Sequence, residues 1–246
     1  MTVSEPSRSR DHSERLLQYL GATLREVDGG IHLSLPASLA ARDWEVPGDP
    51  SAAAFFWVGA AICPGSALVT ESVGLNPTRT GALDALRRMG AKIEVAPSNQ
   101  SGPEPIGRVV VESGPLRATT IEGDEVPRLL DEIPILAVAA ARAEGTTWFR
   151  DVKELRVKES DRIRTTVALL RALGAEVIEE EGAFAVRGPV EFGSARVQSH
   201  GDHRIAMSAL IADCASDGGV EVDQAEMIGT SDPSFVATLA RVTSRG

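Results

Sequence analysis

The densest cluster of charged residues in the sequence spans residues 156–164 and reads Arg-Val-Lys-Glu-Ser-Asp-Arg-Ile-Arg. It directly precedes an apolar-periodic stretch, 167–173, that predicts a helix beginning near Ser160. Crowded cations repel one another unless an anion lies between them, and the N–H groups of a helix start also attract anions. The cluster is therefore consistent with a phosphate or carboxylate site. From the residues alone, a solvated helix start with local ion pairs is the alternative.

A second cluster, His-Gly-Asp-His-Arg, begins at His200 and leads into an alanine-rich helix. Arg204 falls in the first turn, where a cation opposes the helix dipole, so its presence there favours a role such as anion binding. His200 and His203 could bind a metal in principle, but neither has a partnering Cys or a third His, and we expect no metal. His203 is equally consistent with a hydrogen-bonded structural imidazole.

Two adjacent acids, Asp131 and Glu132, precede a third apolar, alanine-rich stretch. One carboxylate is enough to cap a helix, which leaves the other for proton transfer or for binding a hydroxyl group. Acids are common in first turns, so this pair alone is a weak indication of catalysis.

The three clusters belong to a repeated pattern of helix starts and helix ends. In one series a helix ends at a glycine that can take the left-handed conformation, and a strand follows. The glycines of this series are Gly21, Gly90 and Gly174. In the other series an aspartate precedes an alanine-rich helix. The aspartates are Asp49, Asp131 and Asp202. Both series recur at intervals of roughly 70–85 residues, which indicates one repeated β-α-β-α-β-β unit.

The repeat predicts a mixed α/β (α+β) fold in which three alanine-rich helices pack inside a ring of sheets. We expect residues 46–246 to form a three-unit domain of this kind. Residues 1–45 supply only a final αββ piece, which we expect to belong to an otherwise missing domain. The stretch 233–242 resembles a helix whose closing strands do not follow. A single Rossmann-type parallel sheet would contradict this prediction.

Composition narrows the classes of function. The chain has 246 residues, 43 % of them hydrophobic, and a net charge of −10, which argues against a nucleic-acid partner because such proteins neutralise phosphates with a basic surface. No apolar run approaches the roughly 18 residues of a membrane helix, and the start lacks a signal peptide, so we expect a cytoplasmic protein without a membrane partner. The two cysteines, Cys63 and Cys214, are expected to be buried small apolar residues.

Five motifs together resemble the 5-enolpyruvylshikimate-3-phosphate synthases (3-phosphoshikimate 1-carboxyvinyltransferases), and they occur in that family's order from about Arg10 to the C-terminus. They are Val46-Pro-Gly-Asp-Pro-Ser, Asn76-Pro-Thr-Arg-Thr-Gly, Asp131-Glu-Ile-Pro-Ile-Leu-Ala, Arg156-Val-Lys-Glu-Ser-Asp-Arg and Asp202-His-Arg-Ile-Ala-Met. The resemblance implies two domains of three βαβαββ units each, with the active site in the cleft between them. It implies enolpyruvyl transfer from phosphoenolpyruvate to the 5-hydroxyl of shikimate 3-phosphate, with release of phosphate, on the shikimate pathway to chorismate and the aromatic amino acids. It also implies no cofactor, and a monomer when the enzyme is complete.

The resemblance assigns catalytic roles to three residues. Asp131 matches the acid that binds the shikimate hydroxyl and takes its proton, and Lys158 matches the lysine beside that hydroxyl. Glu159 matches the acid that protonates the methylene of phosphoenolpyruvate and later removes a methyl proton.

The resemblance also assigns binding roles. Arg162 and Arg204 match the arginines that bind phosphoenolpyruvate, where guanidinium groups both neutralise and orient an anion. The residues that match contacts to shikimate 3-phosphate are Ser9, Arg10, Asp131 and Lys158. His203 is expected to be a supporting residue of the same site.

Two departures from the family pattern qualify this interpretation. The stretch 228–233 lacks a lysine that contacts phosphoenolpyruvate in part of the family, so the sequence is more similar to the branch without it. The family's N-terminal Lys, Ser and Arg contacts and its central shikimate-binding loop are absent, so the chain would supply nearly all of one wall of the cleft. We therefore expect no measurable catalysis until the missing domain is supplied.

Two alternatives remain open at this point. The first is a non-catalytic fragment or split subunit that binds anions or a complementary half. The second is the related enolpyruvyl transferase that acts on UDP-N-acetylglucosamine, although that enzyme lacks the charged run found at 156–162.

Overall fold

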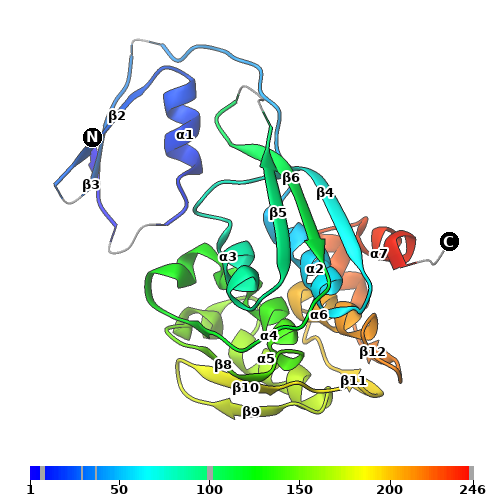
Figure 1. The fold of residues 1–246 in the computed structure, drawn as a ribbon. Helices are drawn as coiled ribbons and strands as arrows, with labels where there is room; N and C mark the ends of the chain where they lie inside the picture. Colours follow the sequence, from blue (N-terminus) through cyan, green and yellow to red (C-terminus); the bar gives the residue numbers. More distant parts are fainter. Residues whose placement is uncertain (6–8, 29, 37, 99–101, 244–246) are drawn as a thin grey trace.

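The computed structural model describes residues 1–5, 9–28, 30–36, 38–98 and 102–243. It confirms the predicted mixed α/β class. Figure 1 shows a small N-terminal unit, in blue, beside a larger body that contains the other helices and strands.

The N-terminal unit contains a helix and a hairpin with one added strand. Its elements are β1 (Thr2–Val3), α1 (His12–Tyr19), β2 (Thr23–Val27) and β3 (Gly30–Ser34), with the sheet order β1-β3-β2. Gly21 ends the helix with a φ of 101°, a conformation that side chains other than glycine rarely adopt. The strand β1 was not predicted, because two residues are too few to show a periodic pattern.

Three inner helices form the centre of the body, as the repeat predicted. They are α2 (Pro50–Ile62), α4 (Ile133–Ala141) and α6 (His203–Asp213), and each packs against the other two. All nine residues of α4 are buried, so this helix is apolar on every side, as a helix in the middle of a core must be.

Three sheets and three outer helices surround these inner helices (Figure 1). The sheet orders are β4-β6-β5, β7-β8-β10-β9 and β11-β12. The strands are β4 (Ala67–Gly74), β5 (Lys92–Pro97), β6 (Ile106–Glu112), β7 (Thr120–Ile121), β8 (Gly145–Phe149), β9 (Glu176–Glu179), β10 (Phe184–Gly188), β11 (Ala195–Val197) and β12 (Val220–Val222). The outer helices are α3 (Gly81–Arg88), α5 (Arg162–Ala172) and α7 (Phe235–Thr243), and the short 3₁₀ segments are η1 (Gly123–Arg128), η2 (Leu130–Glu132), η3 (Lys153–Val157) and η4 (Ala225–Thr230).

The middle unit shows the predicted repeat in full, in the order β7-α4-β8-α5-β9-β10. The strands β7 and β8 are parallel, as a helical crossover requires, whereas β10 pairs antiparallel with both β8 and β9. The first unit opens with a single parallel bridge between Gly48 and Val73 in place of a strand. Gly90 and Gly174 follow the outer helices with φ values of 97° and 90°, as expected for glycines that end helices.

Two helix starts differ from the prediction. The helix α4 begins at Ile133, and Asp131 lies in the preceding 3₁₀ turn without capping it. Pro134 has no N–H group, so the first turn of α4 has one donor fewer to satisfy. The helix α5 begins at Arg162, because the side chain of Asp161 accepts a hydrogen bond from the Arg164 N–H and so occupies the cap position. Because Asp131 caps no helix, its carboxylate is left for other contacts.

Candidate active site

The candidate site lies where the three inner helices begin. Ser51, in the first turn of α2, donates its hydroxyl to the carboxylate of Glu132, which directly precedes α4. Arg204, in the first turn of α6, donates from Nη1 to the carbonyl oxygen of Asp131 at 3.0 Å. Each helix start carries a partial positive charge, so three of them at one place favour an anion.

Asp131 is the centre of this cluster, with its side chain 18 % exposed. Its carboxylate accepts a hydrogen bond from Arg10 Nη2 at 2.7 Å, and it lies 3.3 Å from Arg162 Nη1 and 3.9 Å from Lys158 Nζ. Burial alone would raise the pKa of Asp131, but Arg204, Arg10 and Lys158 lower it, and the net shift is downward. Asp131 is therefore ionised at neutral pH and can accept a hydrogen bond from a substrate hydroxyl.

Arg162 is a buried cation, with a side chain only 1 % exposed. Its Nε donates to Asp202 Oδ2 at 2.9 Å, its Nη1 faces Asp131, and its Nη2 donates to Glu159 Oε2 at 2.5 Å. A charge this deeply buried is stable only when its donors are paired. The three carboxylates fix the guanidinium in one orientation.

Asp202 is the buried partner that joins α5 to α6. Its side chain is 0 % exposed, accepts the Ser160 hydroxyl at 2.8 Å in addition to Arg162, and caps α6 by accepting the Arg204 N–H at 3.0 Å. Burial would raise the pKa of Asp202, but the hydrogen bond from Arg162 and its charge lower the pKa below the usual value. One ionised carboxylate thus positions both arginines that the sequence analysis singled out.

Lys158 and Glu159 precede α5 and complete the cluster. The Lys158 ammonium donates to Glu154 at 2.7 Å as well as facing Asp131, and the Glu159 side chain is exposed. Half-buried His203 follows the α6 cap, where burial and the charge of Arg204 lower the pKa of its imidazole. This imidazole is therefore neutral at pH 7.

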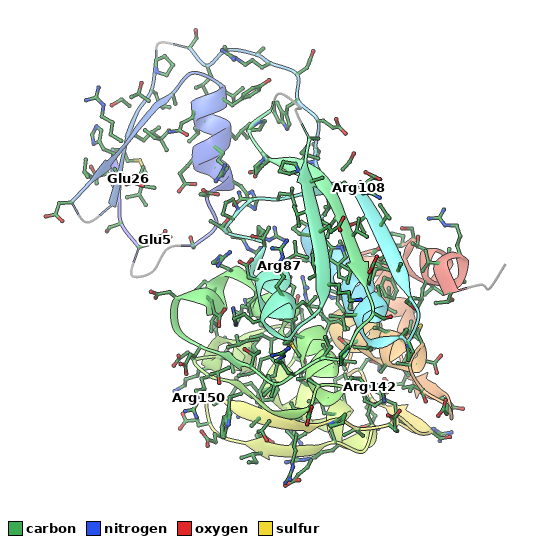
Figure 2. All side chains as sticks on the ribbon, viewed as in Figure 1. Glu5, Glu26, Arg87, Arg108, Arg142 and Arg150 are labelled. Atoms are coloured by element: carbon green, nitrogen blue, oxygen red, sulfur yellow. The ribbon has the colours of Figure 1, made fainter. Side chains whose placement is uncertain are left out.

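The two expected contacts near the N-terminus differ. Arg10 reaches Asp131, whereas Ser9 donates its hydroxyl to Glu5 at 2.6 Å within the N-terminal unit. Figure 2 labels Glu5 in the segment that leads from β1 toward α1. Ser9 is thus the one predicted site residue whose hydrogen bonds point to the N-terminal unit instead of the Asp131 cluster.

Two functional candidates, Ser51 and Arg79, were missed by the sequence analysis, and the burial of Glu132 was not predicted. Glu132 is 2 % exposed and lies 3.7 Å from Arg204 Nη1. Arg79 Nη2 donates to the Ser51 hydroxyl at 2.7 Å, so a continuous polar chain runs from Arg79 through Ser51 and Glu132 to Arg204. Ser51 and Arg79 belong to two of the motifs that carry the family resemblance, so the sequence could have indicated them.

Glu132 should make stability depend on pH. Burial raises its pKa above the ordinary value of 4.5, and the Ser51 hydrogen bond and Arg204 offset only part of this shift. Between 4.5 and the higher folded pKa, the folded chain binds more protons than the unfolded chain, so Glu132 lowers the free energy of unfolding as the pH rises. Glu132→Gln keeps an acceptor for Ser51 but does not titrate.

Relative to the wild type, Glu132→Gln should therefore gain stability with rising pH, by about 1.4 kcal/mol for each unit of pKa shift removed. Urea unfolding of both proteins from about pH 4 to pH 8 measures the difference. A difference that stays constant across this range would contradict the assignment.

The arrangement can bind a multiply charged anion and move protons beside it. Three arginines and a lysine lie around an ionised aspartate, with an exposed glutamate next to them. Within the described part of the chain, no group of three or more His, Cys, Asp or Glu side chains could hold a metal ion. The described helices are also too short or too polar to cross a membrane.

Comparisons with known proteins identify the family. The sequence model of EPSP synthase (3-phosphoshikimate 1-carboxyvinyltransferase) matches residues 1–239. A 3-phosphoshikimate 1-carboxyvinyltransferase from Bacillus subtilis (strain 168) is 46 % identical over 245 residues, which are 99 % of this chain and 57 % of the relative. The protein of the same name from Geobacter sulfurreducens is 47 % identical over 243 residues, with the same two coverages. The chain therefore spans about half the length of the curated relatives it matches.

Solved structures agree with this match. An EPSP synthase from Acinetobacter baumannii superposes with a TM-score of 0.92 at 37 % identity, covering 98 % of this chain and 56 % of that one. The enolpyruvyl transferase NikO from Streptomyces tendae, at 20 % identity and a TM-score of 0.79, shares the fold. From its sequence and its fold together, the chain belongs to the EPSP synthase (3-phosphoshikimate 1-carboxyvinyltransferase) family.

Proposed function

We propose that this chain carries the acid–base and phosphoenolpyruvate-binding groups for enolpyruvyl transfer to the 5-hydroxyl of shikimate 3-phosphate. The observation that supports it most is the ionised carboxylate of Asp131, held among Arg10, Lys158, Arg162 and Arg204. Such a site can neutralise anionic substrates while keeping a proton acceptor beside them. The family match also argues against the alternative acceptor, UDP-N-acetylglucosamine.

In the proposed reaction, Asp131 accepts the proton of the 5-hydroxyl as its oxygen attacks C2 of phosphoenolpyruvate. Once Glu159 has left Arg162 and taken up a proton from solvent, it gives that proton to the methylene carbon, which becomes a methyl group. Glu159 then removes a methyl proton while the C–O bond to phosphate breaks, which restores the carbon–carbon double bond. The hydroxyl proton held by Asp131 leaves with the phosphate. The ammonium of Lys158, 3.9 Å from Asp131, stabilises negative charge on the attacking oxygen.

Binding of phosphoenolpyruvate must change the contacts of Arg162. Its Nη2 donates to Glu159, so a substrate anion that takes this donor displaces the glutamate carboxylate. The displaced Glu159 is exposed and free to reach the methylene carbon. Arg204, in contrast, can keep its hydrogen bond from Nη1 to the Asp131 carbonyl oxygen when the anion binds. Substrate binding and release of the proposed acid would thus be one event.

We further propose that residues 1–45 are the last piece of one domain and that residues 46–246 form the other, with the substrates between them. All residues of α1 are described, and none of them is buried. A groove of about 800 Å³ lies between α1 and its hairpin, with Leu17, Leu24 and Ile31 in its lining. These apolar side chains are what an additional packed segment would cover.

Arg204→Gln should weaken phosphoenolpyruvate binding by about tenfold or more, because a charge-assisted hydrogen bond contributes about 1.5–3 kcal/mol. Titration of the ¹⁵N-arginine-labelled chain with phosphoenolpyruvate, followed by NMR of the side-chain Nε–H groups, measures the affinity even when it is weak. Arg196→Gln is the matched control, since that side chain is 84 % exposed and pairs with Glu221 on β11 and β12. Equal affinities for the wild type and Arg204→Gln would contradict the proposed anion site.

A further inference from the structure

The far ends of the inner helices bring the two cysteines of the chain together. Cys63 directly follows α2 and Cys214 directly follows α6, at equivalent positions of the repeated unit. At the same position after α4 stands Arg142, which Figure 2 labels at this end of the body. This end is opposite to the helix starts that hold the Asp131 cluster.

The thiol of Cys63 lies next to Cys214 itself. Cys63 Sγ is 3.4 Å from the carbonyl oxygen of Cys214, and Cys214 Sγ is 3.4 Å from the carbonyl oxygen of Leu210. The two helices also approach closely here, since a Cβ placed on Gly59 would lie 3.5 Å from the side chain of Ile211. The two cysteines, 151 residues apart in sequence, are thus held close together by the ends of two packed helices.

Both thiols are accessible to small reagents, which corrects the expectation that they are buried. Cys63 is half-buried, Cys214 is exposed, and both line one pocket of about 200 Å³ beside α7. The other lining side chains are largely apolar, and Leu239 and Val242 of α7 are among them. A small neutral oxidant can therefore reach the pair from solvent.

We propose that Cys63 and Cys214 are a redox modification site, at which a peroxide or an azo oxidant converts the two thiols into one disulfide that joins the ends of α2 and α6. With hydrogen peroxide, one thiolate sulfur attacks an oxygen, the O–O bond breaks, and a sulfenic acid and hydroxide form. The second sulfur attacks the sulfenic sulfur, so the S–S bond forms and the S–O bond breaks. In total the two thiols lose two electrons and two protons, and one peroxide becomes two water molecules. An azo oxidant takes up the same electrons and protons at its N=N bond and becomes a hydrazine.

The surroundings of the pair set its rate of oxidation. Although Cys214 is exposed as a residue, the protein around each sulfur removes part of its water, and this desolvation raises the pKa of both thiols. The neighbouring Cys63 and Asp213 help to raise the pKa of Cys214 to about 11. Arg142 offsets part of the shift at Cys63, which makes Cys63 the better first nucleophile. Because the thiolate is the reactive form, oxidation should be slow at neutral pH and accelerate about tenfold per pH unit.

Treatment of the full chain with hydrogen peroxide or diamide at pH 7, 8 and 9 tests the proposal. We expect a monomer that has lost two hydrogen atoms in its intact mass, and a non-reducing digest in which the peptides of Cys63 and Cys214 are joined. The oxidised chain should melt roughly 5–10 °C above the reduced chain, because the cross-link restricts the unfolded state, and dithiothreitol should reverse this. Cys63→Ser and Cys214→Ser should each abolish the intramolecular product.

A second measurement needs neither an oxidant nor a folded variant. Phenylarsine oxide bridges two thiols that lie within reach of each other and releases water, so the native chain should form a stoichiometric adduct that closes both thiols. The proposal would be overturned if phenylarsine oxide left both thiols free or reacted with each one independently. It would also be overturned if oxidation gave a disulfide only between chains, or only in urea.

Discussion

Replacing Asp202 with alanine should lower the free energy of unfolding by about 3–5 kcal/mol, because it leaves the charge of Arg162 buried without its main partner. Arg162 is 1 % exposed and Asp202 is 0 % exposed, so water cannot replace the lost carboxylate without opening the body. The same substitution removes the acceptor of the Ser160 hydroxyl and the cap of α6. Urea unfolding at neutral pH, followed by circular dichroism, measures the loss.

Asp161→Ala is the matched control for this prediction. Asp161 also caps a helix and pairs with an arginine, through the Arg164 N–H and Arg156 Nη1, but its side chain is 35 % exposed. Its removal should cost only about 1 kcal/mol, the usual effect of a lost cap. Equal losses for the two variants would show that the buried pair contributes no more than an ordinary cap.

Much of the fold could be predicted because its signals are local. The glycines at 21, 90 and 174 ended helices as expected, and the aspartates at 49 and 202 capped α2 and α6. Capping and helix termination depend on residues within one turn of each other, so a sequence shows them directly. Asp131 broke this rule, because Pro134 and the 3₁₀ turn before α4 moved the helix start to Ile133.

The site could be predicted only in part. Arg204 stood out because a cation in a first turn is unfavourable, and Arg162 because it lies in the densest charged cluster of the sequence; the structure brings both guanidinium groups to Asp131. The chain from Arg79 through Ser51 to Glu132 was missed, because its members lie on different units and meet only when the inner helices converge. No periodic pattern encodes such a convergence, and an acid such as Glu132 looks like an ordinary helix start until its burial is known.

Full activity should require more than this chain. Enolpyruvyl transfer needs two substrates held in line, and such positioning lowers a reaction barrier by roughly 7–11 kcal/mol. The proposed acid–base groups Asp131, Lys158 and Glu159 all belong to one cluster, and the chain spans about half the length of its relatives. We therefore expect the chain alone to release no phosphate above background, and the chain supplied with the complementary segment of a relative to turn over.

The most direct test of the central claim is phosphate release from phosphoenolpyruvate and shikimate 3-phosphate by this chain combined with the segment of the Bacillus subtilis relative that it does not cover. The account predicts turnover for the wild-type pair, and a loss of about 10²–10⁴-fold when Glu159→Gln removes the proposed acid. Glu181→Gln is the matched control, because Glu181 is exposed and pairs only with Lys153 among the ion pairs of the described residues, and it should leave the rate unchanged. Turnover by the chain alone, or a Glu159→Gln pair as fast as the wild type, would contradict the account.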